Sequence, residues 1–448
     1  MFDRLIDFVR RDRGYVDRFF DYANQFGLKV IRLWAFNYGM PYAWGKYDES
    51  QFQGLDYIVD SAGRHNIKLV LALGNIWKAY RSPEDFMSMA GVDPAGKTLL
   101  DFYNSSQVLH LYRDHVSTIV WRTNVFNGRR YRDDDAIMMW DAINEPRCPG
   151  CMDAAAQAAQ QGFLGAVARQ VRDNAPNQLV ALGTEGYFLN SYESYNPGAG
   201  ARCEGEDWTT LSRLDSIDAT VVHVYERQME SVPPKWSMCD FDCFCNYMIQ
   251  YLNIHQRIAA DMGKPLIMEE YGLVLPHYTV KQRVLLFQLV ADNLAWMRKT
   301  HGPMMGVMFW NAAIGDVWDD GYNVYLDAPI DQPKPSPPIA TTAPTPPASS
   351  SSLPTPSTAQ SEAEPTQSEP SPTQGEPERA PIIQNTETLT DFLRGPQRAA
   401  CAEEAAGWWL PVWTTDWAQT VDMDALRERC RDLTVLQVLL NTKELLYA

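Results

Sequence analysis

Seven short, almost entirely apolar runs divide the first 310 residues of this chain, and no other feature restricts its fold as strongly. They lie at 30–34, 69–73, 137–140, 179–182, 219–223, 265–268 and 306–310. A strand that is apolar at consecutive positions is covered on both faces, which is typical of parallel strands joined by crossover helices. Most steps between the runs are roughly forty residues, enough for one strand and one helix. The sequence therefore predicts an α/β fold, with a (β/α)8 TIM barrel as the economical interpretation and a doubly wound sheet as the alternative.

A (β/α)8 barrel needs eight strands, and only seven runs are visible. Residues 2–27 carry apolar side chains at helical spacing, including Val16, Phe19 and Phe20, and this pattern ends at Gly27. We therefore expect a barrel that lacks its first strand in this chain, which would leave two strand edges unpaired. The longest step, between Trp77 and Tyr131, predicts an extended loop.

The composition divides the chain into three regions. Residues 1–330 form the barrel domain, and 331–388 are rich in Pro, Ser, Thr and Glu, which predicts a disordered linker with or without sugars attached. Residues 389–448 form a small Trp-rich segment of unknown role. Its four tryptophans fit the core of a tiny domain better than a sugar-binding platform. The run 434–440 fits a helix, or else a strand that completes the barrel.

Charge and hydropathy argue against nucleic acid as a partner and against association with a membrane. The net charge of -17 argues against nucleic acid and anionic membrane surfaces, because both would repel this protein. No run of about 18 apolar residues is present, so we expect no transmembrane helix. The first seven residues carry charges where an export signal needs an apolar run, so no such signal is visible. Fourteen tryptophans favour a carbohydrate ligand, although large cores also contain many.

Eight cysteines favour an exported protein over one that stays inside the cell. The pair in Cys148-Pro-Gly-Cys151 fits a redox motif or half of a zinc site, but no second CxxC follows. Structural disulfides in an exported protein are the favoured interpretation. The pairing of the others, at 203, 239, 243, 245, 401 and 430, cannot be read from the sequence.

Polar and aromatic residues stand at the carboxyl ends of the runs, where the catalytic groups of a (β/α)8 barrel lie. In chain order the candidates are Arg32, Trp34, Asn75, Trp77, Asn144, Glu145, Glu185, His223, Tyr225, Glu270 and Trp310. Each one alone has a structural explanation, such as a helix cap, an ion pair or a buried ring. The set has no shared explanation of that sort, because burying so many polar groups is costly unless they have a function.

Glu145 and Glu270 end two runs that face each other across the predicted barrel. Cleavage of an acetal needs one carboxyl group to protonate the leaving oxygen and another to attack carbon or to activate water. We expect desolvation beside Asn144 to raise the pKa of Glu145, and Arg32 with Tyr225 to keep Glu270 ionised. The sequence therefore predicts a glycoside hydrolase that needs no metal and no cofactor.

At these residues the chain resembles the retaining glycoside hydrolases of family 5, and more closely the endo-β-1,4-mannanases of plants and fungi. The resemblance covers residues 5–330. Its motifs are IRLWAF at 31–36, YDESQFQGLD at 47–56, NEPRC at 144–148, GTEGY at 183–187, HVY at 223–225, EEYG at 269–272 and FW at 309–310.

The resemblance implies that Glu145 is the acid/base and that Glu270, the second of two adjacent glutamates, is the nucleophile. It implies that the other candidates bind substrate, and that Cys148 and Cys151 form a disulfide. The chain departs from the family in lacking a match to its first strand, in Asn75-Ile76-Trp77 where Asn-Asn-Trp is frequent, and in Glu226 where proline is usual.

We therefore expect a secreted retaining endo-β-1,4-mannanase, acting on mannan, glucomannan or galactomannan by double displacement. A β-1,4-glucanase and an inactive carbohydrate-binding relative are the alternatives. The expected partner is β-mannan, with neither nucleic acid nor membrane. We expect a monomer located outside the cell or in a cell wall.

Overall fold

The structure is a computed structural model of the 448-residue chain. It describes residues 12–328 except 79–80, 190, 227, 229–239 and 276, together with Ile6, Val9 and residues 423–447 except 432 and 434. The predicted linker at 331–388 and the four tryptophans at 408–417 lie outside the described residues.

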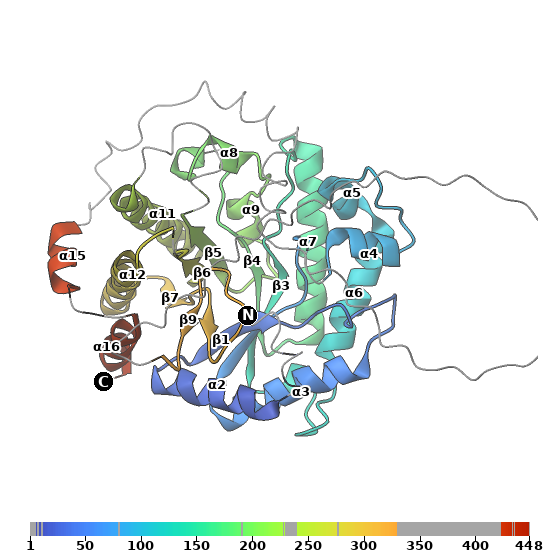
Figure 1. Cartoon of the computed structure of the whole chain (residues 1–448). Helices are drawn as coiled ribbons and strands as arrows, with labels where there is room; N and C mark the ends of the chain where they lie inside the picture. Colours follow the sequence, from blue (N-terminus) through green and yellow to red (C-terminus); the bar gives the residue numbers. More distant parts are fainter. Residues whose placement is uncertain are drawn as a thin grey trace, which may run out of the picture.

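Seven parallel strands form the centre of the molecule (Figure 1). They are β1 (Val30–Trp34), β2 (Lys68–Ala72), β3 (Ile137–Asn144), β4 (Leu179–Gly183), β5 (Thr220–Tyr225), β6 (Leu266–Gly272) and β7 (Met304–Val307). The order is β1-β2-β3-β4 in one sheet and β5-β6-β7 in a second. The amide of Asp218, just before β5, donates to the carbonyl of Val180 in β4 over 2.8 Å, so the second sheet continues the first. Each of the seven predicted runs overlaps one of these strands, although β7 ends at Val307 within the predicted run 306–310.

Helices cover the outside of these strands (Figure 1). The longer ones are α2 (Arg13–Gln25), α3 (Glu49–Arg64), α6 (Ser106–Val120), α7 (Ala154–Asn174), α11 (Phe241–Met262) and α12 (Val280–Thr300). The shorter ones are α4 (Pro83–Met89), α5 (Leu99–Asn104), α8 (Ala199–Arg202) and α9 (Trp208–Ser212). The expectation of an extended loop between Trp77 and Tyr131 is wrong, because α4, α5 and α6 occupy that region. The sequence carries their start signals, since Ser82, Thr98 and Ser105 each accept a backbone N–H at a helix N-terminus.

Apolar side chains from neighbouring strands close the inside of the strand array beneath the site. Val70, Met139, Ala181 and Val221, from β2, β3, β4 and β5, are fully buried against one another. This layered filling is typical of the interior of a (β/α)8 barrel. The site therefore lies beyond this apolar layer, toward the carboxyl ends of the strands.

The two end strands of this array are not paired with each other. Among the described residues no ladder joins β1 to β7, as expected for a barrel in which seven of eight strands are present. The region is bridged instead by a two-stranded pair, β8 (Ala312–Ala313) and β9 (Val324–Tyr325), and by α2. The Tyr15 hydroxyl of α2 donates to the carbonyl of Ile314 over 3.1 Å.

Two C-terminal helices pack back onto the barrel. They are α15 (Met423–Arg429) and α16 (Val435–Tyr447), so the run at 434–440 is helical and does not add a strand. Leu426, Val435, Leu436 and Val438 join the main hydrophobic core. Figure 1 places α16 beside α12, and the Lys443 ammonium donates to the carbonyl of Gln25 at the end of α2 over 2.9 Å.

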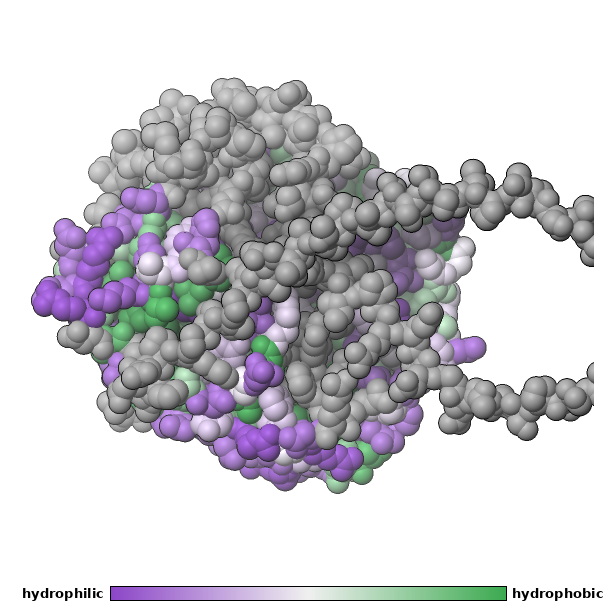
Figure 2. Space-filling model, viewed as in Figure 1, coloured by the Kyte–Doolittle hydropathy of each residue, from purple (hydrophilic) through white to green (hydrophobic). Residues whose placement is uncertain are grey.

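Hydropathy agrees with this packing. Figure 2 shows a hydrophilic outer surface at the edge of the molecule where α15 lies, with hydrophobic residues beside it toward the barrel. None of the helices in the described part of the chain has the length and apolar character needed to span a membrane.

Candidate active site

Glu145 follows the end of β3 and has an unusual backbone. Its φ of 47° lies in the left-handed region, which a residue with a side chain rarely adopts. Such a conformation persists only where its surroundings enforce it, and it is frequent at active sites. Here the Glu145 amide donates to the carbonyl of Gly183 in β4 over 2.7 Å.

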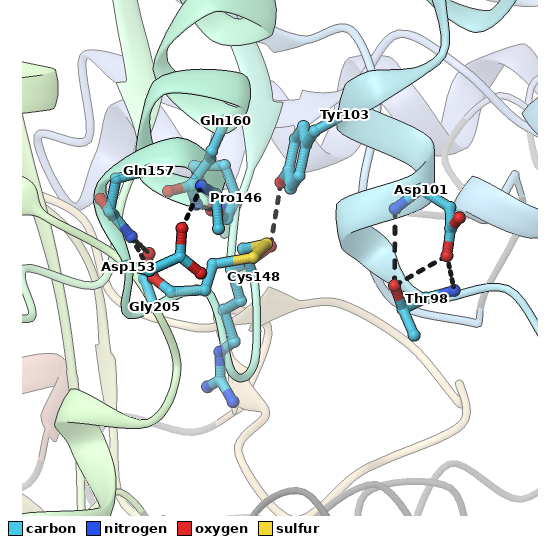
Figure 3. The surroundings of a disulfide bond; sticks show 12 residues. Thr98, Asp101, Tyr103, Pro146, Cys148, Asp153, Gln157, Gln160 and Gly205 are labelled. Atoms are coloured by element: carbon cyan, nitrogen blue, oxygen red, sulfur yellow. Dashed lines mark hydrogen bonds between the residues drawn. A yellow bond between two sulfur atoms is a disulfide. The ribbon is translucent and has the colours of Figure 1, made fainter.

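The loop after Glu145 is held from several sides (Figure 3). The Gln160 side chain of α7 donates to the carbonyl of Pro146 over 2.6 Å, and the Tyr103 hydroxyl of α5 donates to the carbonyl of Arg147 over 2.9 Å. Cys148 and Cys151 form the disulfide that the resemblance implied. Cys203 and Cys243 are also disulfide-bonded, whereas Cys245 and Cys430 are free.

Arg32 is the central cation of the site. Its guanidinium lies 2.5 Å from Glu270 Oε1 and 2.5 Å from Asp141 Oδ2, and it donates to Asn144 Oδ1 over 2.7 Å. Burial lowers the pKa of Arg32, but the neighbouring carboxylates outweigh burial and raise it above its ordinary value. Arg32 therefore stays charged and neutralises part of a dense acidic cluster.

A bulge in β3 makes this cluster possible. Asp141 and Asn144 are three residues apart and would point to opposite faces of a regular strand. The register between β3 and β4 shifts between these two residues, so both side chains reach Arg32. Burial raises the pKa of Asp141 to about 7, although Arg32 opposes that change.

His223 connects the two glutamates. Its Nδ1 lies 2.9 Å from Glu145 Oε1 and 3.8 Å from Glu270 Oε1. The Tyr225 hydroxyl donates to the other oxygen of Glu270, Oε2, over 2.8 Å. The structure thus brings the candidates of β3, β5 and β6 into one site.

The protonation of Glu145 differs from the expectation. Burial raises its pKa, but the hydrogen bond and the charge of His223 outweigh burial and hold the pKa of Glu145 below its ordinary value. Conversely, burial lowers the pKa of His223, but Glu270, Glu145 and Glu269 raise it well above its ordinary value. The expected raised pKa of Glu145 is therefore wrong for the protein without substrate.

Aromatic rings border the site on two sides. Trp77 donates its indole N–H to Glu145 Oε2. Trp34 and Trp310 lie together, with ring centroids 6.0 Å apart, and Trp310 is anchored by its indole N–H to Asp320 over 3.0 Å. Flat apolar faces of this kind can stack against a sugar ring.

Glu185 and Asn75 occupy less direct positions. Asn75 accepts a hydrogen bond from the Asn144 side chain over 3.0 Å, so it orients a residue that contacts Arg32. Glu185 forms a buried ion pair with Arg147, whose guanidinium lies 4.7 Å from the centre of the Trp77 ring. Asn75 is therefore connected to the site by its contact with Asn144, and Glu185 by its contact with Arg147.

Three charged residues of the site were missed in the choice of candidates. Asp141 carried a signal, because it is an acidic residue inside an apolar run. Arg147 follows directly in the Asn-Glu-Pro-Arg motif, and Glu269 precedes the predicted nucleophile. Only their contacts reveal that all three are buried inside the site.

Glu145, His223 and Glu270 also have the geometry of a possible cation site, since each offers one ligand atom and these lie within 4.8 Å of one another. Arg32 already supplies a positive charge 2.5 Å from Glu270, and the surrounding carboxylates raise the pKa of His223 well above its ordinary value. A metal ion would have to compete with both cations, so these residues do not fit a resident metal.

Known proteins are similar to this chain over more than half of its length. The family model described as GH family 5 beta-mannosidase-like matches residues 32–319. Mannan endo-1,4-beta-mannosidase 1 of Arabidopsis thaliana is 30% identical over 346 residues, covering 73% of this chain and 80% of that protein. Mannan endo-1,4-beta-mannosidase 4 of Solanum lycopersicum is 29% identical, covering 68% and 76% respectively.

A solved structure shares the fold. The endo-beta-1,4-mannanase of Thermotoga petrophila is 25% identical, with a TM-score of 0.61 over 70% of each chain. The matched family model spans more than half of the present sequence and ends within the loop that carries Asp320. The chain therefore belongs to glycoside hydrolase family 5, in its beta-mannosidase-like group.

Proposed function

We propose that this protein is a mannan endo-1,4-β-mannosidase that cleaves internal β-1,4-mannosidic bonds of mannan, glucomannan or galactomannan with retention of configuration. The observation that carries the proposal is the approach of the two glutamates. One oxygen of Glu145 and one of Glu270 lie within 4.8 Å of each other. Retaining glycosidases hold these groups about 5–5.5 Å apart, whereas inverting enzymes need about 6.5–9.5 Å.

The two glutamates divide the reaction between them. In the first step the Glu270 carboxylate attacks the anomeric carbon, the glycosidic bond breaks, and a proton passes from Glu145 to the leaving oxygen. In the second step Glu145 takes a proton from water, which attacks the same carbon and releases Glu270. Arg32 and Tyr225 hold Glu270 in place for attack, with contacts of 2.5 and 2.8 Å to its two oxygens.

The remaining candidates form the walls of the cleft. We assign Trp34 and Trp310 to stacking on the sugar beside the nucleophile, and Trp77 to the acid/base side, where it already contacts Glu145. Asn144 and Asn75 offer amides to sugar hydroxyls, and Glu185 with Arg147 extends the polar lining beyond Trp77.

The names of the relatives support mannan as substrate over β-glucan, since the Arabidopsis and tomato proteins are both called mannan endo-1,4-beta-mannosidases.

We also propose that the protein is exported and acts as a monomer outside the cell or in a cell wall. Disulfides at Cys148–Cys151, Cys203 and Cys243 support an oxidising compartment. The glycosylation motif that begins at Asn104 is exposed at the end of α5.

The direct test measures reducing ends released from galactomannan and glucomannan by the full chain and by its Glu145→Ala and Glu270→Ala variants. Both variants are expected to lose activity by at least roughly 1000-fold. Glu84→Ala, which changes a partly exposed glutamate of α4, is the matched control and should retain activity. Hydrolysis surviving in either site variant would overturn the assignment.

Two further measurements separate the alternatives. Faster hydrolysis of carboxymethylcellulose than of mannan by the same preparation would favour a β-1,4-glucanase. Binding to insoluble mannan without any hydrolysis would favour an inactive relative.

A further inference from the structure

Glu269, the first of the two adjacent glutamates, takes no part in the steps above, yet it lies at the centre of the site. Its side chain is fully buried, and its Oε2 is 3.2 Å from Arg32 Nε and 3.5 Å from His223 Nε2. A buried carboxylate is costly unless it has charged partners, and here it has two. We therefore asked what Glu269 itself contributes to the site.

An irregularity in β6 brings Glu269 inward. Successive residues of a regular strand point to opposite faces, so only one of two adjacent glutamates should face the site. In the β5–β6 ladder, however, Val222 pairs with Met268 and the next residue, His223, pairs with Glu270. Glu269 is the extra residue of a bulge, and both glutamates consequently reach the interior.

The His223 ring therefore lies between two carboxylates. Nδ1 faces Glu145 Oε1 at 2.9 Å, and Nε2 faces Glu269 Oε2 at 3.5 Å. A neutral imidazole can donate from only one nitrogen, whereas the imidazolium can donate from both. This arrangement favours the charged ring in spite of its burial.

Other charged groups also face this ring from the neighbouring strands. They are Glu270 of β6, Asp141 of β3 and Glu185 of the segment after β4, with Arg32 of β1 and Arg147 of the segment after β3 as their partners. The two arginines are paired with Glu270, Asp141 and Glu185, so the carboxylates directly at the ring nitrogens remain Glu145 and Glu269.

We propose that Glu269 is a positioning residue that keeps His223 protonated, so that the His223–Glu145 pair holds the proton delivered to the leaving group. This inference rests on the proposed function and deepens it. The pair carries one mobile proton before glycosylation, shared between Nδ1 and Glu145 Oε1. In the first step that proton ends on the leaving oxygen, which leaves His223 neutral and Glu145 ionised. In the second step the proton of the attacking water returns to the pair.

The test is the pH profile of kcat/KM on a soluble mannooligosaccharide for the wild type and Glu269→Gln. The amide keeps the shape of the side chain but removes the charge, so the pair loses its proton at lower pH. The alkaline limb should move down by about 1–3 pH units relative to the acid limb, whatever the height of the plateau between them. Glu269→Asp, which restores the charge, should return the alkaline limb toward its original position.

Asp56→Asn is the matched control. Asp56 is a fully buried carboxylate with an arginine and a tyrosine as partners, Arg122 at 2.7 Å and Tyr131 at 2.7 Å, and it lies outside the site. Its neutralisation should lower stability without moving either limb. A Glu269→Gln profile that is lowered equally at every pH would overturn the proposal, because that is the result of a purely structural role.

A second measurement applies if Glu269→Gln does not fold. Nitrogen-15 NMR of the histidines in the wild type should show both ring nitrogens of His223 protonated at pH 7, and a neutral ring would contradict the proposal. The two levels of inference fail separately. Loss of hydrolysis in the Glu145 and Glu270 variants with an unchanged Glu269→Gln profile would remove only the role of Glu269.

Discussion

At the residue scale, the site depends on how a few cations and donors hold several buried carboxylates. Arg32 contacts Asp141, Glu269 and Glu270, and its own side chain is almost fully buried. Removing one partner of such a group leaves the others buried and uncompensated, which typically costs about 3–5 kcal/mol. Variants of Arg32 would therefore lose stability as well as activity, and the two effects could not be separated. A variant of Tyr225 tests more directly how the nucleophile is held.

Tyr225→Phe is expected to lower kcat/KM by roughly 10–100-fold, because a hydrogen bond to a charged group contributes about 1.5–3 kcal/mol. The ring remains, so its edge-on packing against Tyr322, with centroids 5.4 Å apart, should preserve the fold. Tyr131→Phe is the matched control, since it removes a buried hydroxyl that donates to Asp56 far from the site. Steady-state kinetics of both variants check the prediction, and equal effects would contradict it.

Two other histidines, His115 and His255, make the folded protein sensitive to acid. Burial lowers the pKa of each to about 4. Because this lies below the unfolded value of about 6.5, the stability that each neutral histidine contributes is fully present above pH 6.5 and is lost as the pH falls toward 4. At pH 4.5 the protonation of each histidine should lower the free energy of unfolding by roughly 2–3 kcal/mol. Urea unfolding at pH 7 and at pH 4.5 gives the loss of unfolding free energy between the two pH values. This loss should be smaller for His115→Gln than for the wild type, and an equal loss would contradict the prediction.

At the element scale, the strands could be predicted and their irregularities could not. Continuous apolar runs locate all seven strands, because parallel strands are covered on both faces. The bulges in β3 and β6 leave no such pattern, since they arise from pairing with the neighbouring strands. For that reason Glu145 and Glu270 were recognisable at strand ends, whereas the inward positions of Asp141 and Glu269 were not.

The loop after β3 gives a prediction at the same scale. The Cys148→Ser/Cys151→Ser double variant should lower the free energy of unfolding by about 2 kcal/mol and raise KM, because the loop carries Arg147 beside Trp77. Cys430→Ser changes a buried free thiol and is the control. Denaturant unfolding and mannan kinetics provide the readouts, and an unchanged KM would show that the disulfide does not position Arg147.

At the scale of the whole molecule, residues distant in sequence complete the outer layer. We propose that α15 and α16 belong to the barrel domain, although the composition predicts a separate C-terminal segment. α16 lies along α12 and reaches the end of α2, the place where the helix that follows the last strand of a barrel belongs (Figure 1). A long polar stretch separates α16 from β9, so local sequence patterns could not reveal this packing.

Ending the chain at residue 328 is therefore expected to destabilise the barrel itself. Leu426, Val435, Leu436 and Val438 are buried against it, and each fully buried aliphatic side chain contributes about 1.5–3 kcal/mol. The truncated chain should melt at a clearly lower temperature and expose the apolar side of α12, which increased binding of a hydrophobic dye would report. A matched internal deletion of residues 340–400 keeps both helices and should melt like the full chain. If the truncated chain instead keeps the full melting temperature and mannan hydrolysis, α15 and α16 form no part of the domain, because loss of that much buried surface could not leave its stability unchanged.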